Sequence, residues 1–285
     1  MKKIDLHVHS NISDGSYTPV EIIRLAKDKG LAAVTLTDHD SIAGDSAAMA
    51  EARRMEIDFL PGMEMTTDYA ERRLHIICLG FDPQHPAFRK LYKKIRSIKE
   101  AQIPELIAGV AARGLPITPE LVRPYANGCM DRYAVMRYLV SLHLYDRAQP
   151  LWDLYLDPVV AELGLNYNVR AEEALPLVHE AGGITSLAHF HKKIGLRGLE
   201  RSEQEKAIAQ LHAMGLDGME RWYPSYTAED AAFAAQMIER YELVETGGTD
   251  FHGTNRVGIE LGTGWQNNLQ IPYACYEKIA ALTQG

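Results

Sequence analysis

Histidine and carboxylate side chains recur in short clusters along the whole 285-residue chain. In order, the clusters are Asp5-Leu6-His7-Val8-His9 with Asp14, Asp38-His39-Asp40, Glu64, His75, His189 and Asp250-Phe251-His252. Imidazole and carboxylate ligands without cysteine thiolates favour Mn²⁺, Fe²⁺ or Zn²⁺ in a reactive site over a structural zinc. So many ligands need more than one cation, and clustered cations activate a water and stabilise an oxyanion. The pattern therefore predicts a multinuclear metal site in a hydrolase, with phosphoester hydrolysis as the expected chemistry.

Each cluster has a simpler interpretation when it is taken alone. Asp14 lies in a turn sequence, and Glu64 by itself would be an exposed loop residue. His189 alone would more often be a histidine of the core, and Asp40 alone would cap a helix. The histidines interpreted as structural or exposed are His85, His143, His179 and His212. The metal site is favoured because the clusters coincide at several strand ends.

The clusters fall where β-strands are expected to end. After a first strand that begins near Ile4, strands are expected at 31–37, 57–63, 74–80, 184–188, 217–222 and 243–248. Apolar residues of the first strand alternate with Asp5, His7 and His9, so these three side chains share one face. His75 is the exception, because it lies near the start of its strand. A parallel α/β barrel brings the carboxyl ends of its strands to one face, where its active site forms.

Helical patterns replace this alternation in the middle of the chain. Helices are expected at 87–101, 104–113, 132–144 and 149–156. We therefore expect an α/β fold in which residues 1–84 and 166–285 form a metal-binding barrel. Residues 85–165 are expected to form an inserted helical subdomain that covers the active site.

The composition excludes several classes of protein. A net charge of −8 disfavours a stable complex with long nucleic acid, which requires a basic surface. The three cysteines occur singly, which indicates a reducing compartment. The N-terminal residues lead directly into a strand-like segment, and no apolar run is long enough to span a membrane. We expect a cytoplasmic enzyme whose partner is a small phosphorylated substrate, with no membrane association and no obligate protein partner.

Several longer segments resemble the PHP (polymerase and histidinol phosphatase) family of metal-dependent phosphoesterases. The segments are DLHVHSNISDGS, TLTDHDS, PGMEM, LHIICLGFD, AGGITSLAH, YPSYTAED and TGGTDFHG, and the resemblance covers roughly 2–82 and 166–262. Their order is most similar to the stand-alone branch that hydrolyses nucleoside 3′,5′-bisphosphates and trims short RNA 5′ ends. The resemblance implies a distorted seven-stranded TIM-like (β/α) barrel that holds three divalent metal ions, Mn²⁺, Fe²⁺ or Zn²⁺.

The resemblance also implies a role for each ligand. The first metal would be held by His7, His9, Glu64 and Asp250. The second would share Glu64 and add His75 and His189. The third would be held by Asp14, His39 and His252. A hydroxide bridging the metals would attack phosphorus, with Asp38, His39, Glu64 and Asp250 as the catalytic side chains.

Three positions depart from the family pattern where the substrate would be recognised. Phe190 replaces the proline of an Ala-His-Pro segment, Ala134 replaces a histidine, and Tyr226 replaces another histidine. The resemblance leaves Arg132, Lys192, Lys193, His191 and Tyr226 as the candidate substrate-binding residues. Guanidinium and ammonium groups suit a second phosphate.

The expected reaction is hydrolysis of a phosphomonoester, or of a phosphodiester, in a small metabolite such as a nucleoside 3′,5′-bisphosphate. Histidinol phosphate and sugar phosphates are the alternative substrates within this class. Hydrolysis of a carbon–nitrogen bond is a second class of reaction, because related metal barrels perform it. A non-catalytic metal-binding module is the third alternative.

Overall fold

The computed structural model describes residues 2–145 and 148–283, which form two compact units. One unit comprises Met1–Leu91 and Arg170–Gly285, and the other comprises Tyr92–Val169. These boundaries lie close to those expected for the barrel and the helical subdomain. That the helical unit covers the active site stays a prediction. Among the described residues, no helix is both long enough and apolar enough to cross a membrane.

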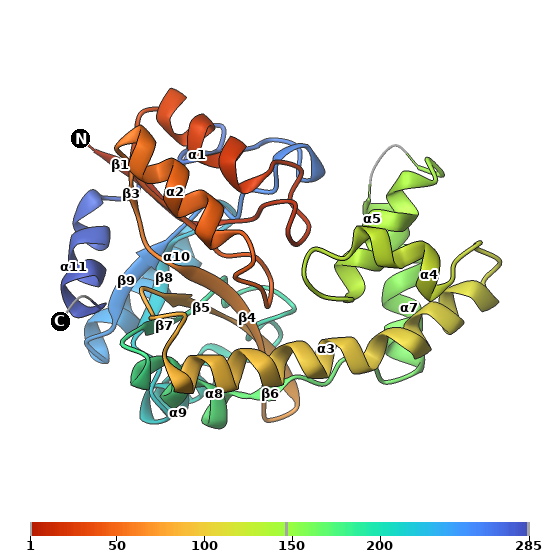
Figure 1. Cartoon of the computed structure of the whole chain (residues 1–285). Helices are drawn as coiled ribbons and strands as arrows, with labels where there is room; N and C mark the ends of the chain where they lie inside the picture. The colour runs from red at the N-terminus through yellow and green to blue at the C-terminus, as the bar shows by residue number, and fades with distance from the viewer. Residues whose placement is uncertain (1, 146–147, 284–285) are drawn as a thin grey trace. The chain divides into compact units, whose positions relative to one another are not determined.

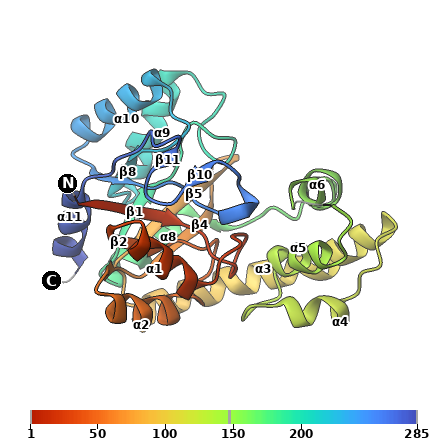
Figure 2. The ribbon, with the colours of Figure 1, turned by 90° about the horizontal axis from the view of Figure 1, so that it is seen from above.

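The first unit is an α/β structure with mixed sheets. One sheet contains β1 (Lys3–Val8), β2 (Leu31–Leu36) and β3 (Asp58–Phe59), all parallel. A second sheet contains, in this order, β6 (Val169–Arg170), β4 (Gly62–Tyr69), β5 (Arg72–Leu79), β7 (Ile184–Leu187), β8 (Gly218–Trp222) and β9 (Val244–Gly247). The short strands β10 (Ile259–Glu260) and β11 (Gly264–Trp265) pair separately and lie beside β1 (Figure 2).

Two isolated bridges join the larger sheets. Val8 pairs with Phe251, which connects β1 to the segment after β9. His39 pairs with Glu64, which connects the segment after β2 to β4. Each junction between the two sheets consists of one pair of residues, so the strands form an α/β structure of separate mixed sheets joined at two points. Both junctions lie at or beside predicted metal ligands.

The strand directions differ in part from the expectation of a parallel sheet. β5 runs antiparallel to both β4 and β7, whereas β7, β8 and β9 are mutually parallel. The reason is the two-residue turn between β4 and β5, at Ala70 and Glu71, because only antiparallel strands accept so short a connection. The reversal also explains His75. Its position near the start of β5 places it opposite Thr66 of β4, near the other ligands.

The expected strand 57–63 is two strands. β3 ends at Phe59 and pairs with β2, and β4 begins at Gly62 and pairs with β5. Leu60 and Pro61 separate them. The apolar pattern of this segment reports burial, and it does not distinguish one strand from two strands with different partners.

The helices of this unit cover the sheets. α1 (Pro19–Asp28) begins with a capping box formed by Thr18 and Glu21, and buries Ile22 and Ile23. α1 and α2 (Asp45–Met55) pack on each other beside β2 and β3, and α11 (Tyr273–Thr283) packs against β1, β7 and β9 (Figure 1). The remaining long helices are α8 (Ala171–Glu180), α9 (Arg201–Ala213) and α10 (Ala228–Arg240).

The second unit is helical, as expected for this part of the chain. It contains most of α3 (Pro86–Ala112), then α4 (Pro119–Val122), α5 (Arg132–Ser141), α6 (Gln149–Leu151) and α7 (Asp157–Glu162). A short 3₁₀ turn at Arg123–Tyr125 and a π-helical turn at Trp152–Leu156 connect these helices, and the two-residue strand β6 (Val169–Arg170) ends the segment. The unit has its own apolar core, in which Val110, Leu139 and Val159 are fully buried.

Candidate metal centre

The structure brings the nine predicted ligand side chains together. His7 and His9 stand at the end of β1, His39 follows β2, and Glu64 and His75 lie on β4 and β5. His189 follows β7, Asp250 and His252 follow β9, and Asp14 comes from the loop before α1. Six strands thus each contribute at least one ligand. Three groups of these side chains have ligand atoms within 4.8 Å of one another.

The first group consists of His7, His9, Glu64 and Asp250, the set predicted for the first metal. The Nε2 atoms of His7 and His9 lie 3.2 Å apart. Glu64 approaches these two nitrogens at 3.4 Å with Oε1 and at 3.2 Å with Oε2. Asp250 Oδ1 lies 3.2 Å from His9 Nε2. The lone pairs of two imidazoles and two carboxylates therefore converge on one point.

The second group consists of His39, Glu64 and His75. His75 Nδ1 lies 2.8 Å from Glu64 Oε1, and His39 Nδ1, expected at the third cation, lies 3.0 Å from Glu64 Oε2. His189, expected at the second cation, is outside this group, although its Nε2 lies 2.8 Å from Glu64 Oε1. Both oxygens of Glu64 thus face imidazole nitrogens, which is the geometry required of a bridging carboxylate.

The third group contains Asp14, His39 and His252, with His9 in addition. Asp14 Oδ1 lies 3.3 Å from His252 Nε2, and Asp14 Oδ2 lies 3.7 Å from His39 Nε2. The rings of His9 and His252 stack with their centroids 4.1 Å apart. Because His9 and His39 each belong to two groups, the three groups form one continuous centre.

Burial of these groups shows that the residues fit divalent cations. All except Asp14 are less than a tenth exposed, and His7, His9 and Glu64 are fully buried. Within the described residues, His9 Nδ1, His189 Nδ1 and His252 Nε2 make no hydrogen bond of good geometry. Buried polar atoms without such partners cost free energy, and metal coordination removes that cost. A donor set of imidazole and carboxylate suits divalent transition metals.

The carboxylates of the centre are held in their charged form. Burial by itself would raise the pKa of Glu64, but the neighbouring His75, His7 and His39 bring it well below its usual range. Burial by itself would also raise the pKa of Asp250, but Arg256 and Lys192 lower it well below its usual range. Anionic carboxylates are the form that binds a cation.

The histidines divide into two classes. Burial lowers the pKa of His39 to about 4 and that of His189 to about 3, so both imidazoles are neutral near pH 7. Burial also disfavours the charged form of His9, but hydrogen bonds to Asp250 and Glu64 raise its pKa to about 9. Since metals bind the neutral ring, cation binding displaces a proton from His9.

Glu220 is a functional residue that the sequence analysis missed. This buried residue of β8 places Oε1 2.7 Å from His7 Nδ1, and its Oε2 accepts a hydrogen bond from the His189 backbone N–H at 2.6 Å. A carboxylate on the second ring nitrogen fixes the tautomer, so that Nε2 of His7 faces the metal position. The signal in the sequence was a lone glutamate within the apolar strand 217–222.

Asp38, expected among the catalytic side chains, positions the loop that carries Asp14. One of its oxygens accepts from the backbone N–H of Ser10 at 2.8 Å and the hydroxyl of Ser13 at 2.6 Å. The other accepts from the hydroxyl of Ser10 at 2.6 Å. Asp5 acts similarly, because it accepts from the backbone N–H of Thr249 at 2.9 Å and its hydroxyl at 2.6 Å.

The backbone at the centre is strained where ligands leave the strands. Asp40, His189 and Asp250 have positive φ angles of 52°, 23° and 54°. Such conformations are uncommon for residues with a side chain and concentrate at functional sites. Gly248 also serves the geometry, because a Cβ at this position would lie 2.1 Å from Cβ of His7. Backbone after β9 therefore passes directly against β1.

The predicted substrate-binding residues lie in different surroundings. Lys192 Nζ is 3.0 Å from Asp250 Oδ2, at the centre itself. His191 Nε2 lies 2.9 Å from Ser225 Oγ, and Tyr226 donates its hydroxyl to the Glu220 carbonyl at 3.1 Å. Lys193 is exposed.

Arg132 belongs to the helical unit. Its guanidinium lies over the rings of Tyr133 and Trp152, 5.1 and 5.7 Å from their centroids. A role for Arg132 at the substrate stays a prediction.

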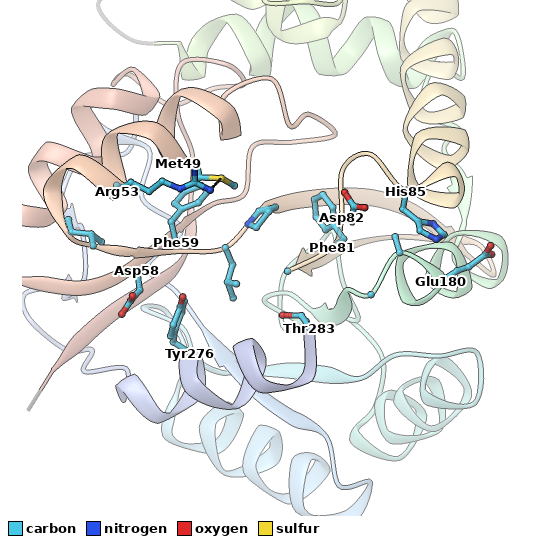
Figure 3. A pocket seen from close by; sticks show the side chains of 17 residues that line it. Met49, Arg53, Asp58, Phe59, Phe81, Asp82, His85, Glu180, Tyr276 and Thr283 are labelled. Atoms are coloured by element: carbon cyan, nitrogen blue, oxygen red, sulfur yellow. Dashed lines mark hydrogen bonds between the residues drawn. The ribbon is translucent and has the colours of Figure 1, made fainter. Parts of the chain in front are cut away.

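A separate cavity of about 600 Å³ lies in the first unit at the other end of the strands (Figure 3). Met49 and Arg53 of α2 line one side, and Tyr276 and Thr283 of α11 line another. Asp58, which also lines the cavity, pairs with Ala33 in the first half of β2, whereas His39 lies beyond the other end of that strand. None of the nine ligand side chains lines this cavity, so it is not the metal centre.

Comparison with known proteins identifies relatives of this chain. The model of the PHP domain family matches residues 5–155. A relative from Haemophilus influenzae described as a 5′-3′ exoribonuclease is 30% identical over 256 residues, which are 88% of this chain and 90% of the relative. A 3′,5′-nucleoside bisphosphate phosphatase from Chromobacterium violaceum is 30% identical over 264 residues, or 92% and 91% of the two chains.

A solved structure from Bifidobacterium adolescentis shares the fold, with a TM-score of 0.84 at 23% identity over 99% of this chain and 96% of the other. The family match begins at Asp5 and includes the ligand side chains from His7 to His75, and the alignment to the relatives extends over nearly the entire sequence. The protein whose strand ends assemble this centre is thus a member of the PHP domain family.

Proposed function

We propose that this protein is a metal-dependent phosphoesterase that removes a phosphate from a small nucleotide, such as a nucleoside 3′,5′-bisphosphate. The observation that carries the proposal is the convergence of eight imidazole and carboxylate side chains, nearly all buried, in three adjoining groups, with His189 in contact with Glu64. The family match and the phosphoester substrates named for the relatives support the same chemistry. An acidic chain of net charge −8 suits a small substrate better than a long nucleic acid.

The three groups support a site for three divalent ions, with Mn²⁺, Fe²⁺ and Zn²⁺ as the candidates. When bound, such cations supply a nucleophilic water at neutral pH and neutralise phosphoryl oxygens. Glu64 would be shared between the first and second ions, and His39 would stand between the second and third. Glu220 orients His7, and Asp38 fixes the loop of Asp14, so that the ligands are held before the substrate binds.

The proposal extends to the architecture. We infer that the bridges Val8–Phe251 and His39–Glu64 close the strands β1, β2, β4, β5, β7, β8 and β9 into a distorted seven-stranded barrel. In this arrangement the ligands line its mouth.

Replacement of His9 by alanine tests the metal centre. His9 belongs to two of the three groups, so His9→Ala should reduce phosphate release by at least about 1,000-fold, the size of effect expected for a residue central to transition-state stabilisation. The measurement is phosphate release from a panel of nucleotides and sugar phosphates after loading with Mn²⁺ or Zn²⁺. The matched control is His212→Ala, an exposed histidine on α9, which should retain wild-type rates.

A metal-loaded wild-type protein that releases no phosphate from the panel would refute the proposed function. Adenosine 3′,5′-bisphosphate and histidinol phosphate in parallel separate the two expected substrate classes. Amide hydrolysis without phosphate release would instead indicate carbon–nitrogen chemistry.

A further inference from the structure

Asp250 divides its two carboxylate oxygens between two surroundings. Oδ1 faces the metal centre, at 3.2 Å from His9 Nε2 and 3.5 Å from both His7 Nε2 and His252 Nδ1. Oδ2 has its own set of donors, none of which is an imidazole. One carboxylate therefore connects the centre with a second, distinct cluster of side chains.

The second cluster contains two cations and a phenol. Asp250 Oδ2 accepts hydrogen bonds from Tyr223, from Lys192 at 3.0 Å, and from Arg256. Lys192 Nζ also donates to the Tyr223 hydroxyl and lies 4.7 Å from the centroid of that ring. Arg256 additionally donates to the backbone carbonyl of Asp250 at 3.1 Å. We name Lys192, Tyr223 and Arg256 the Asp250 donor cluster.

The cluster brings more positive charge to Asp250 Oδ2 than that oxygen carries negative charge. Tyr223 is almost fully buried and donates its hydroxyl to the same oxygen. Lys192 and Arg256 bring two positive charges to one oxygen, and their side chains are 34% and 40% exposed. An ammonium has three N–H donors and a guanidinium has five, so both have donors beyond those that Asp250 uses. Cations placed at the edge of a metal site attract anionic ligands.

The cluster comes from two segments of the chain. Lys192 lies three residues after the ligand His189. Arg256 follows the 3₁₀ turn Gly253–Asn255, directly after the ligand His252. Both cations are thus linked to metal ligands by a few residues of backbone, which fixes their distance from the centre.

We propose that Lys192 and Arg256 form an anion subsite beside the metal centre, which binds a second anionic group of the substrate. This inference rests on the proposed function and adds its selectivity: a nucleotide with two phosphates is preferred over one with a single phosphate. The planar guanidinium of Arg256 can donate two parallel hydrogen bonds to phosphate oxygens. The ammonium of Lys192, which contacts the same oxygen of Asp250, adds a second positive charge. Tyr223 holds both the lysine and the carboxylate in place.

Paired substrates test the subsite. The ratio of kcat/KM for adenosine 3′,5′-bisphosphate to that for adenosine 3′- or 5′-monophosphate should fall about 10- to 100-fold in Arg256→Gln, the loss expected for one charged hydrogen bond. Lys192→Met should lower the same ratio, and Arg256→Lys should restore part of it. Lys206→Met is the matched control, because it removes an exposed lysine of α9 with the same change of charge, and its ratio should equal that of the wild type.

Two further measurements separate selectivity from a purely structural role. Elemental analysis gives the metal content of each variant. Calorimetry with chelator-treated protein gives the binding of adenosine 3′,5′-bisphosphate without turnover, and we expect about 10-fold weaker binding for Arg256→Gln. An unchanged ratio in Arg256→Gln, or a parallel loss of both activities together with metal, would overturn the subsite. If the wild-type protein is inactive on every phosphoester, the proposed function is wrong. The calorimetric comparison of the wild type with Arg256→Gln then tests the subsite by itself.

Discussion

The buried carboxylates around the centre differ in what their oxygens contact. Glu64 and Asp250 direct oxygens at imidazole nitrogens, whereas Asp5 and Asp38 accept hydrogen bonds from backbone and hydroxyl groups. Glu220 combines the two, because it contacts a ligand ring and the backbone of a second ligand. The first type binds cations, the second type holds loops, and Glu220 orients the ligands themselves. These roles predict different losses on mutation.

Replacement of Glu220 should weaken metal binding without removing a ligand. Loss of an outer carboxylate typically lowers metal affinity about 10- to 100-fold, so we expect this range for Glu220→Leu and a smaller loss for Glu220→Gln, which still accepts a hydrogen bond. Titration with a competing chelator measures the affinity. Glu245→Gln, on the neighbouring strand β9, is the control and should bind metal as the wild type does. Wild-type affinity in Glu220→Leu would contradict the orienting role.

At the scale of elements, the pairing of α1 with α2 depends on one glutamate. Glu51 of α2 accepts hydrogen bonds from Arg54 at 2.6 and 2.8 Å, and from Arg24 of α1 at 2.7 Å. The hydrogen bonds from Arg54 and then Arg24 lower the pKa of Glu51 to about 2. Because these helices pack beside β2 and β3, the contact supports the segment that leads to His39.

The lowered pKa of Glu51 predicts a pH-dependent contribution to stability. A carboxylate with a depressed pKa stabilises the folded chain above its ordinary pKa of about 4.5, and this stabilisation is lost as the pH falls towards about 2. The melting temperature of the wild type should therefore exceed that of Glu51→Gln at pH 6, and the difference should shrink below pH 4.5. Thermal melts from pH 6 to pH 3 test this, with Glu239→Gln of α10 as the control. A difference that stays constant over this range would contradict the assignment.

At the scale of the whole molecule, the metal centre lies where the two larger sheets of the first unit meet. Among the described residues, the strand pairing between these sheets consists of single bridges, and both bridges involve or adjoin ligands. Side-chain hydrogen bonds such as His7–Glu220, and an apolar core that includes Leu6 and Leu79, also join the sheets. Cations held by ligands from six strands would therefore add to the stability of this unit. The helical unit has its own apolar core.

Chelation should lower the melting temperature of the first unit. A cation present at 100 times its dissociation constant adds about 2.7 kcal/mol to stability, which corresponds to roughly 5–10 °C for a unit of this size. Differential scanning calorimetry with and without chelator measures the shift, and addition of Mn²⁺ or Zn²⁺ should reverse it. His9→Ala should show a much smaller shift. Equal melting temperatures of the wild type in both conditions would count against cation binding at the centre.

The sequence was sufficient to predict much of this arrangement. His39 and Glu64 follow apolar runs, and a carboxylate or imidazole buried at the end of a strand costs free energy unless a cation or a hydrogen bond compensates it. The long helical segment was equally evident from its periodicity. The group of His7, His9, Glu64 and Asp250 is the set that the resemblance implies, whereas the group of Glu64 and His75 contains His39 in place of His189.

Other features depended on contacts that periodicity does not report. The direction of β5 follows from the short turn at Ala70, and the pattern of β5 is the same in either direction. Glu220 contacts His7 from 213 residues away, and Arg256 reaches Asp250 only because the segment after β9 folds back. Apolar spacing indicates which side chains are buried, and it does not identify the partner of a buried charge.

The spread of the ligands along the chain has a consequence for biosynthesis. The group of His39, Glu64 and His75 comes from the first third of the polypeptide, whereas the other two groups are complete only after Asp250 or His252, near the end, has been synthesised. A nascent chain of which only the early segments have left the ribosome therefore contains an incomplete site. The remaining ligands are added after the helical unit has been translated. We expect truncated products that stop before residue 250 to retain less metal than the full-length protein.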